Sequence, residues 1–322
     1  MIRKYFALAL VALLFAAKSY AQQDPYYSFF MFNKMVYNPA YAGSKDAICA
    51  TAVYKKQWTG FDGAPEFQTL SINSPIAKQR AGVGLGIIND KLGYESSLNV
   101  VFSFAYKIKL NSAGTSNLAV GAAGGFMQKS LDGTKLTPEQ TGDPKIPVSK
   151  VSATAPDVNA GIYYTNSTIG PLKNVYAGLS ATHLMQSTIS YATTTGNTVD
   201  SKLATHYYMV AGAAYDLTSS LTLEPNLLIK KDPAKLQIDF NAFVLYNNKI
   251  RGGLVYRSGD AFIGMLGYQF NENFHAGYSY DFTTSQLNKF SGGSHEIYVT
   301  YCFKFKPPVP KIPNIRLTPR YL

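Results

Sequence analysis

Long stretches of this sequence alternate, residue by residue, between large apolar side chains and small or polar ones. From 274 to 283, aromatic or apolar residues occupy every second position, and His, Gly, Ser, Asp and Thr fill the positions between them. Successive side chains of a β-strand point to opposite faces, so each such stretch predicts a strand with one apolar and one polar face. We therefore expect an all-β protein.

Fourteen strands follow from this pattern, and many of them are 10 to 15 residues long. Strands of soluble sheets usually have about 5 to 6 residues, whereas a tilted strand that crosses a bilayer needs about 9 to 11. The strand lengths thus favour a membrane barrel over a soluble sandwich. The predicted strands lie at 48–58, 65–74, 81–89, 95–110, 117–129, 154–165, 171–185, 203–217, 221–231, 235–247, 249–257, 260–270, 273–283 and 294–306.

The connections between these strands differ systematically in length. The connections after even-numbered strands, such as 218–220 and 271–272, are short, whereas the two longest, 130–153 and 186–202, follow odd-numbered strands. Outer-membrane barrels have short periplasmic turns, longer external loops and an even number of strands. An open sheet edge finds no hydrogen-bond partners in membrane lipid, so the sheet must close. We predict a 14-stranded antiparallel transmembrane β-barrel of the bacterial outer membrane.

The first 21 residues have the three parts of a secretory signal peptide. Arg3 and Lys4 precede an apolar run at 6–17, and small residues follow at Ser19 and Ala21. We predict cleavage after Ala21, because the apolar run is too short to span a bilayer as a helix. Export from the cytoplasm argues against nucleic acid as a partner, despite a formal net charge of +11.

Residues 22–47 precede the barrel strands (48–306) and are dense in Tyr and Phe. These aromatic side chains must be shielded from water. A 14-stranded barrel encloses a lumen wider than its own side chains fill. We therefore expect the segment to pack inside the lumen as a plug.

Residues 307–322 form a Pro-rich, basic tail after the last predicted strand. It contains Arg316, Pro319 and Arg320 and no acidic residue. Its proline content favours an extended segment with few hydrogen bonds. Two interpretations remain open: a disordered terminus, and a peptide that docks on a periplasmic partner.

The two cysteines fall near the periplasmic ends of the first and last predicted strands. Those strands are neighbours in a closed barrel, and the alternation directs both Cys49 and Cys302 inward. We expect the two side chains to face each other where the barrel closes, either as a disulfide or as an unbonded pair.

Catalytic and cofactor signals are weak. The four histidines, His183, His206, His275 and His295, are scattered, without metal-ligand spacing. His275, Ser279 and Asp281 share one strand face, but positions two apart lie about 6.8 Å apart, too far for the hydrogen bonds of a triad. We interpret them as polar residues of the lumen and expect no enzymatic activity, metal or other cofactor.

Charged residues on the polar strand faces allow two interpretations. The basic ones are Lys55, Lys107, Lys109, Arg251, Arg257, Lys304 and Lys306, and the acidic ones are Glu224, Asp239, Asp281 and Glu296. Ion pairing within a polar lumen is the ordinary explanation. The other is an electropositive path for an anionic group.

Two motifs stand at the start of the mature chain. The first comprises Asn38, Pro39, Ala40, Tyr41, Ala42 and Gly43, and the second includes Gln57, Trp58, Gly60, Phe61 and Pro65. Asn-Pro and Ala-Gly pairs favour a tight bend before the first strand. Trp58 and Phe61 fall where that strand meets its first outer loop, at the level of interfacial aromatic residues. A partner-binding role for this loop is a secondary interpretation.

Together the two motifs resemble those of the PorP/SprF family of outer-membrane proteins, which serve type IX secretion and gliding in Bacteroidetes. The resemblance implies a 14-stranded barrel with a role in secretion and no enzymatic activity. Some members retain the C-terminal domains of very large adhesins at the cell surface, and others work with the periplasmic ring of the secretion machine. Family chains often end in Pro-Arg and aromatic residues; here Pro319 and Arg320 precede a single aromatic residue.

The expected function is therefore non-catalytic binding of a secreted, adhesin-like protein through its type IX C-terminal domain, for export or surface retention. One alternative is a passive or substrate-specific channel with an N-terminal hatch, which ion conductance would favour. Another is an outer-membrane hydrolase, against which the lack of a credible nucleophile–base pair argues.

Overall fold

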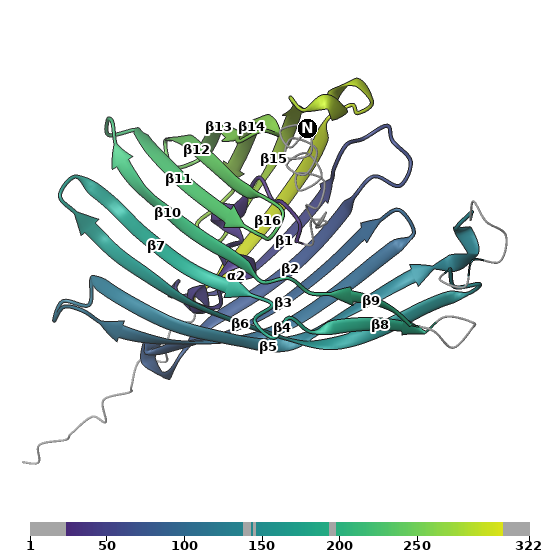
Figure 1. Ribbon diagram of the computed structural model, residues 1–322. Coiled ribbons are helices and arrows are strands. Elements are labelled where there is room, and N and C mark those ends of the chain that lie inside the picture. Colours follow the sequence, from purple (N-terminus) through teal and green to yellow (C-terminus); the bar gives the residue numbers. More distant parts are fainter. Residues whose placement is uncertain (1–23, 138–142, 144–145, 193–197, 305–322) are drawn as a thin grey trace, which may run out of the picture.

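The computed structural model describes residues 24–137, 143, 146–192 and 198–304. The predicted signal peptide and the tail with Arg316, Pro319 and Arg320 lie outside the described residues. Fourteen antiparallel strands form a closed barrel (Figure 1), so the predicted fold class is confirmed. Among the described residues there is no helix with the length and apolarity that crossing a bilayer requires.

Each barrel strand pairs with its neighbours in the sequence, and β1 pairs with β16 to close the sheet. The strands are β1 (Ile48–Lys56), β2 (Glu66–Ile76), β3 (Ala81–Leu92), β4 (Glu95–Lys109), β5 (Ser116–Asp132), β6 (Lys150–Ile169), β7 (Leu172–Thr182), β10 (His206–Asp216), β11 (Leu221–Lys231), β12 (Leu236–Tyr246), β13 (Ile250–Arg257), β14 (Ala261–Gln269), β15 (Phe274–Thr283) and β16 (Ser294–Phe303).

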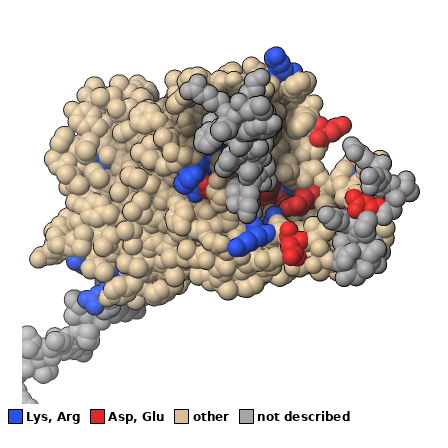
Figure 2. Space-filling view, viewed as in Figure 1, with Lys and Arg blue, Asp and Glu red and all other residues tan. Residues whose placement is uncertain are grey.

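The alternation of the sequence becomes an apolar outer wall and a polar inner one. Outward side chains such as Phe102, Leu254 and Leu266 are 62%, 73% and 66% exposed, whereas the inward Asn241 and Ser279 are fully buried. Figure 2 shows an outer wall almost free of charged side chains on this side, with acidic side chains gathered at the end of the longer connections. Such a wall suits the hydrocarbon core of a membrane.

The structure differs from the prediction around the two longest connections. β5 and β6 extend further than expected and shorten the predicted 130–153 loop. The predicted 186–202 loop contains a hairpin of β8 (Thr188–Ala192) and β9 (Thr198–Lys202). Ile189 and Tyr191 of the hairpin are buried with Met127 and Ala155 of the extended strands. The alternation in β8 spans only five residues, too short to separate a strand from a loop in the sequence.

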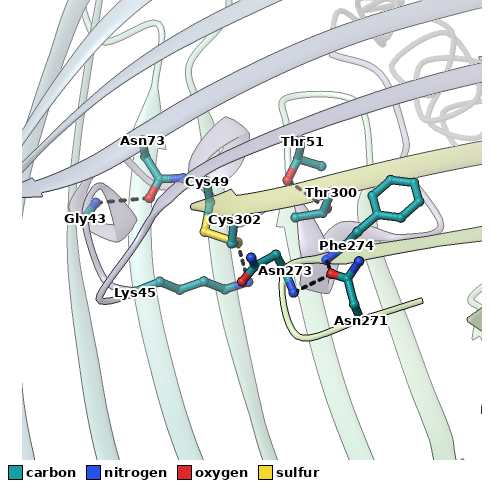
Figure 3. Close-up of a disulfide and its surroundings, with 10 residues drawn as sticks. All are labelled: Gly43, Lys45, Cys49, Thr51, Asn73, Asn271, Asn273, Phe274, Thr300 and Cys302. Carbon is teal, nitrogen blue, oxygen red and sulfur yellow. Dashed lines mark hydrogen bonds between the residues drawn. A yellow bond between two sulfur atoms is a disulfide. The ribbon is translucent and has the colours of Figure 1, made fainter. Parts of the chain in front are cut away.

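The closure seam, where β1 meets β16, carries the two cysteines. Cys49 lies opposite Cys302 in the strand register, and their Sγ atoms are joined in a disulfide of 2.08 Å (Figure 3). Two residues further along β1, the hydroxyl groups of Thr51 and its partner Thr300 on β16 form a hydrogen bond of 2.9 Å. The seam is therefore held by a covalent bond as well as by the strand ladder.

The segment before β1 contains three short helical turns. They are η1 (Phe30–Phe32), α2 (Lys34–Tyr37) and η2 (Pro39–Tyr41). In Figure 1 this purple segment is enclosed by the strands. Its buried aromatic side chains form one apolar cluster with inward residues of the wall, among them Phe243 and Tyr298. The apolar core of the protein therefore lies inside the barrel.

Candidate functional site: an occupied lumen with two polar mouths

Aromatic side chains of the N-terminal segment fill the lumen. Tyr27, Phe29 and Phe30 are at most 1% exposed. The Phe29 ring lies 4.4 Å from that of Tyr298 and 6.5 Å from that of Phe243, measured between centroids. Aromatic pairs at these separations add to the stabilisation from burial. The many aromatic side chains of this segment are therefore shielded from water inside the lumen.

A group of buried charges on β1, β12, β13, β15 and β16 faces the segment from the same side of the barrel as Phe243 and Tyr298. Lys55 Nζ lies 2.7 Å from Asp281 and 3.3 Å from Glu296. Arg257 lies 3.0 Å from Asp239 and 3.4 Å from Asp281. All five side chains are at most 4% exposed. The two cations are compensated by three carboxylates, so this part of the lumen favours ion pairing over an electropositive path.

The same carboxylates hold the backbone of the N-terminal segment. Glu296 accepts hydrogen bonds from the backbone amides of Ser28 and Phe29, at 2.7 and 2.9 Å. The Ser28 hydroxyl donates to Asp281 at 3.0 Å. Hydrogen bonds to a buried carboxylate are stronger than those between neutral groups. Glu296, the carboxylate in excess of the two cations, is therefore stabilised by main-chain amides. The same hydrogen bonds fix the segment to β15 and β16.

The first motif anchors the segment to a different part of the inner surface, at β6 and β7. Asn38 Oδ1 accepts a hydrogen bond from the Ala40 amide at 2.9 Å and so caps η2. Its Nδ2 donates to the carbonyl oxygens of Ile162 on β6 and Leu179 on β7, at 2.9 and 3.3 Å. The expected bend is present, since Gly43 has a φ of +63°. The side chain that begins it also binds the barrel wall.

Wall glycines make room for this motif. A Cβ atom on Gly121 would lie 2.4 Å from the Ala40 Cα, and one on Gly82 would lie 2.0 Å from the Ala42 carbonyl oxygen. No side chain fits at such distances, so glycine is required by close backbone approach. The remaining ring, Tyr41, packs edge-on against Tyr163 at 5.4 Å between centroids, and Pro39 is the first residue of η2.

The second motif ties the outer loops together. The Gln57 amide donates to the Pro65 carbonyl at 2.9 Å and closes the β1–β2 connection. The Trp58 amide donates to Ser294 Oγ at 3.1 Å. Thr59 exchanges backbone hydrogen bonds with the β15–β16 connection, at 2.8 Å to the Gly293 carbonyl and 2.7 Å from the Gly292 amide. The loop is thus held at the seam on the end of the longer connections, which outer-membrane barrels direct outward.

An outer cavity of about 560 Å³ opens beside this loop. Gly60 takes a φ of +94° there, and the Phe61 side chain that follows is 47% exposed. Charges of both signs surround the aromatic ring. The lining charged residues are Lys56, Asp62, Glu66, Lys91, Glu95, Asp132, Lys135 and Lys150. An aromatic side chain amid mixed charges suits the recognition of a protein surface.

An inner cavity of about 580 Å³ opens at the end of the short turns. Its lining includes Lys34, Lys45, Lys107 and Lys109, with Asp46 as the acidic residue among the lining residues. The Lys34 Nζ lies 3.6 Å from the centroid of the Tyr176 ring. Burial, with a smaller contribution from the charge of Lys45, lowers the pKa of Lys34 to about 7. Of the basic residues noted in the sequence, Lys107 and Lys109 line this cavity, whereas Lys34 and Lys45 come from the N-terminal segment.

The scattered histidines have different surroundings. His183 follows β7 and His206 begins β10, and their rings lie 5.6 Å apart between centroids, next to Asp24. They are far apart in the sequence and lack metal-ligand spacing there, but the direct pairing of β7 with β10 brings them together, and linear spacing carries no signal of it. His275 is a buried lumen residue beside Tyr298, as expected, and the more exposed His295 hydrogen-bonds to Tyr278 on the outer wall.

Comparisons with known proteins identify one family model and several solved structures. A family model described as "Type IX secretion system membrane protein PorP/SprF" matches residues 19–301. No curated protein matches the chain. Similar solved structures include the CymD monoaromatic hydrocarbon channel, at 13% identity and a TM-score of 0.49 over 85% of this chain and 93% of that chain. A Pseudomonas aeruginosa FadL homologue has 13% identity and a TM-score of 0.45, over 84% and 93%. The KdgM porin has 14% identity and a TM-score of 0.38, over 79% of this chain and 99% of that chain.

Proposed function

Because this chain belongs to the PorP/SprF family of type IX secretion system membrane proteins, we propose that it is a non-catalytic outer-membrane barrel that binds a secreted, adhesin-like protein. It would recognise that protein's C-terminal domain and help to export it or retain it at the cell surface. Surface retention needs no covalent chemistry in this scheme. It needs a stable platform in the membrane and an accessible recognition surface.

The occupied lumen carries this proposal. Glu296 binds the Ser28 and Phe29 amides from one side of the wall, and Asn38 binds backbone carbonyls of β6 and β7 from the other. A segment that is hydrogen-bonded to two parts of the inner surface and packed with aromatic rings is not suited to open and close as a hatch. The interior therefore supports a platform whose partners bind at its mouths, rather than a route through which solutes pass.

The outer mouth offers the recognition surface for the secreted domain. Phe61 projects beside a cavity of about 560 Å³ with charges of both signs. Backbone hydrogen bonds from Thr59 to the β15–β16 connection hold the loop before binding. A pre-organised loop loses less conformational entropy when a partner docks. Aromatic residues at the centre of such surfaces often dominate the binding energy.

The inner mouth supports a second contact, with proteins of the periplasmic secretion ring. Lys45 and Lys107 line the basic cavity there and favour an acidic surface on the partner. The basic tail with Arg316, Pro319 and Arg320 would add to the same contact. Contacts of this kind weaken as salt is added, because the charges are screened.

The test uses the purified mature chain in detergent and a purified C-terminal domain from a protein secreted by the type IX system. We expect binding to the wild type and at least about a tenfold loss with Phe61→Ala, as for an aromatic residue at the centre of an interface. Phe290→Ala is the matched control, because Phe290 is an exposed phenylalanine of another outer loop, after η5 (Gln286–Lys289). Equal losses in both variants would contradict the assignment to the outer cavity.

The channel alternative is tested on the same protein in planar bilayers. We expect little solute flux through the wild type and a clear increase when residues 22–44 are deleted, because that segment fills the lumen. Flux that is nearly unchanged by the deletion would contradict a plug. High flux through the wild type together with no binding of the secreted domain would favour a channel.

A further inference from the structure

We propose that Asp24, His183 and His206 form a binding site for one divalent transition-metal ion such as Zn²⁺. The three residues come from separate parts of the chain: the N-terminal segment, the residue after β7 and the first residue of β10. Their potential ligand atoms all lie within 4.8 Å of one another. This proposal does not depend on the partner proposed above, because the site lies in the lumen, away from both proposed docking surfaces.

The distances suit a small ion with nitrogen and oxygen ligands. His183 Nε2 lies 2.9 Å from Asp24 Oδ1, and His206 Nδ1 lies 3.5 Å from Asp24 Oδ2. Zinc binds such atoms at about 2.0–2.2 Å in tetrahedral geometry, which places the ligand atoms roughly 3.3 Å from one another. Side-chain shifts of a few tenths of an ångström to about one ångström would complete the coordination.

Both imidazoles face a second carboxylate on the side away from Asp24. Asp157 Oδ2 lies 3.0 Å from His183 Nδ1, and Asp232 Oδ2 lies 3.9 Å from His206 Nε2. Histidines that bind metals usually donate their other ring N–H to a carboxylate, which fixes the tautomer and orients the ring. Here each ring has a carboxylate on its outer side, as an ion-pair contact for His183 and as a charge beyond hydrogen-bond distance for His206, and its inner nitrogen lies on the side of Asp24.

An unsatisfied nitrogen and a small cavity both lie next to Asp24. His206 is 1% exposed, and its Nδ1 has no hydrogen-bond partner among the described residues. A cavity of about 30 Å³ adjoins Asp24 and His183, with Asn99 and Thr182 in its lining. This is enough for one water molecule with polar partners. Such a water would supply a fourth ligand to an ion held by three side chains.

The local charge also favours a cation. Asp24, Asp157 and Asp232 supply three carboxylates. Lys230 donates to the Asp24 backbone carbonyl at 2.8 Å, and Tyr208 donates to Asp24 Oδ2 at 2.6 Å. With neutral imidazoles the group has a net charge of −2, which a divalent ion neutralises. Two protonated imidazoles would achieve the same balance, so the experiment must distinguish metal from protons.

The experiment uses the mature protein in detergent, with a tag free of histidine, stripped with a chelator and dialysed. Titration with Zn²⁺ followed by calorimetry and elemental analysis should give one bound equivalent. Co²⁺ should give the visible absorption of a low-symmetry, nitrogen-ligated ion. Absence of saturable Zn²⁺ binding by the folded wild type would overturn the proposal and leave proton-balanced ion pairs as the explanation.

Variants locate the ion. His206→Asn and Asp24→Asn should lose the bound equivalent, and Asp157→Asn should weaken binding about ten- to a hundredfold as the loss of an outer carboxylate does. His275→Gln, at another buried histidine, and His295→Asn, on the outer wall, should retain it. Binding that depends on His295 and survives His206→Asn would overturn the assignment. Heat-dependent gel mobility checks that each variant is a closed barrel, and the Co²⁺ spectrum of the wild type tests histidine ligation even if a variant fails to fold.

Discussion

Glu296, on the last strand of the barrel, accepts a hydrogen bond from the backbone amide of Phe29 in the N-terminal segment. This bond, with its neighbour from Ser28, joins the N-terminal segment to the last strand inside the lumen. The last strand, which closes the barrel, thus also holds the N-terminal segment in the lumen. Its retention depends on a few charged residues that can be changed one at a time.

Replacement of Glu296 by Gln should loosen the segment without preventing barrel formation. The change leaves Asp239 and Asp281 to pair with the two buried cations, and it removes the charge that accepts the Ser28 and Phe29 amides. Loss of hydrogen bonds to a charged group costs about 1.5–3 kcal/mol. We expect faster hydrogen exchange at the amides of residues 26–32 and increased solute flux. Glu272→Gln is the control, because Glu272 is 90% exposed in an inner turn. Unchanged exchange in Glu296→Gln would show that the carboxylate does not hold the segment.

Gly121→Ala should disturb the docking of the first motif. The added Cβ would lie 2.4 Å from Ala40 backbone atoms, and overpacking of this kind costs roughly 1–3 kcal/mol. We expect a lower unfolding temperature and greater protease sensitivity before β1. Gly124→Ala on the same strand meets no atom within 4 Å and should behave like the wild type. Similar behaviour of the two variants would mean that the segment does not rest on Gly121.

Cys302→Ser should destabilise the barrel at its closure seam. The disulfide links residues separated by 253 positions, and loss of such a bond typically costs about 2–4 kcal/mol. We expect a lower unfolding temperature that matches that of reduced wild type, with no further effect of reductant on the variant. A variant as stable as the oxidised wild type would show that the strand ladder alone holds the seam.

Lys34→Met should stabilise the protein in a pH-dependent manner. Burial lowers the pKa of Lys34 to about 7 in the folded state, below its usual value of 10.5 when unfolded. The cost of burying the charge is therefore complete below pH 7 and declines as pH rises from 7 towards 10.5. We expect the variant to unfold at a higher temperature than the wild type at pH 6, with a smaller difference at pH 9. Lys249→Met, at an exposed turn, should show no such trend, and a gain independent of pH would contradict the explanation.

The fold was predictable because its main signal is local. Alternation along β15, with Tyr278 outside and Ser279 inside, can be read from any ten residues of the strand. Closure then follows from the absence of hydrogen-bond partners in lipid, and it places Cys49 beside Cys302 without knowledge of any other contact. The β8–β9 hairpin escaped notice because its alternation is short and its burial depends on extended neighbours.

The interior was less predictable because it depends on register and depth. Asn38 reads as a turn residue, and its hydrogen bonds to β6 and β7 require knowledge of which wall positions lie at the same height. His183 and His206 are separated in sequence by the hairpin and approach only because β7 and β10 pair directly. Asp24 adds a third contribution from a segment without any alternation. Such coincidences arise from the packing of the whole barrel.

The enclosed segment also bears on assembly. The bond between Cys49 and Cys302 can form only when the first and last strands are side by side. The same strands enclose the aromatic residues of the N-terminal segment in the closed barrel. An oxidised Cys49–Cys302 pair therefore marks a chain whose first and last strands have met, and the oxidised fraction of newly made chains is a lower bound on the fraction of closed barrels.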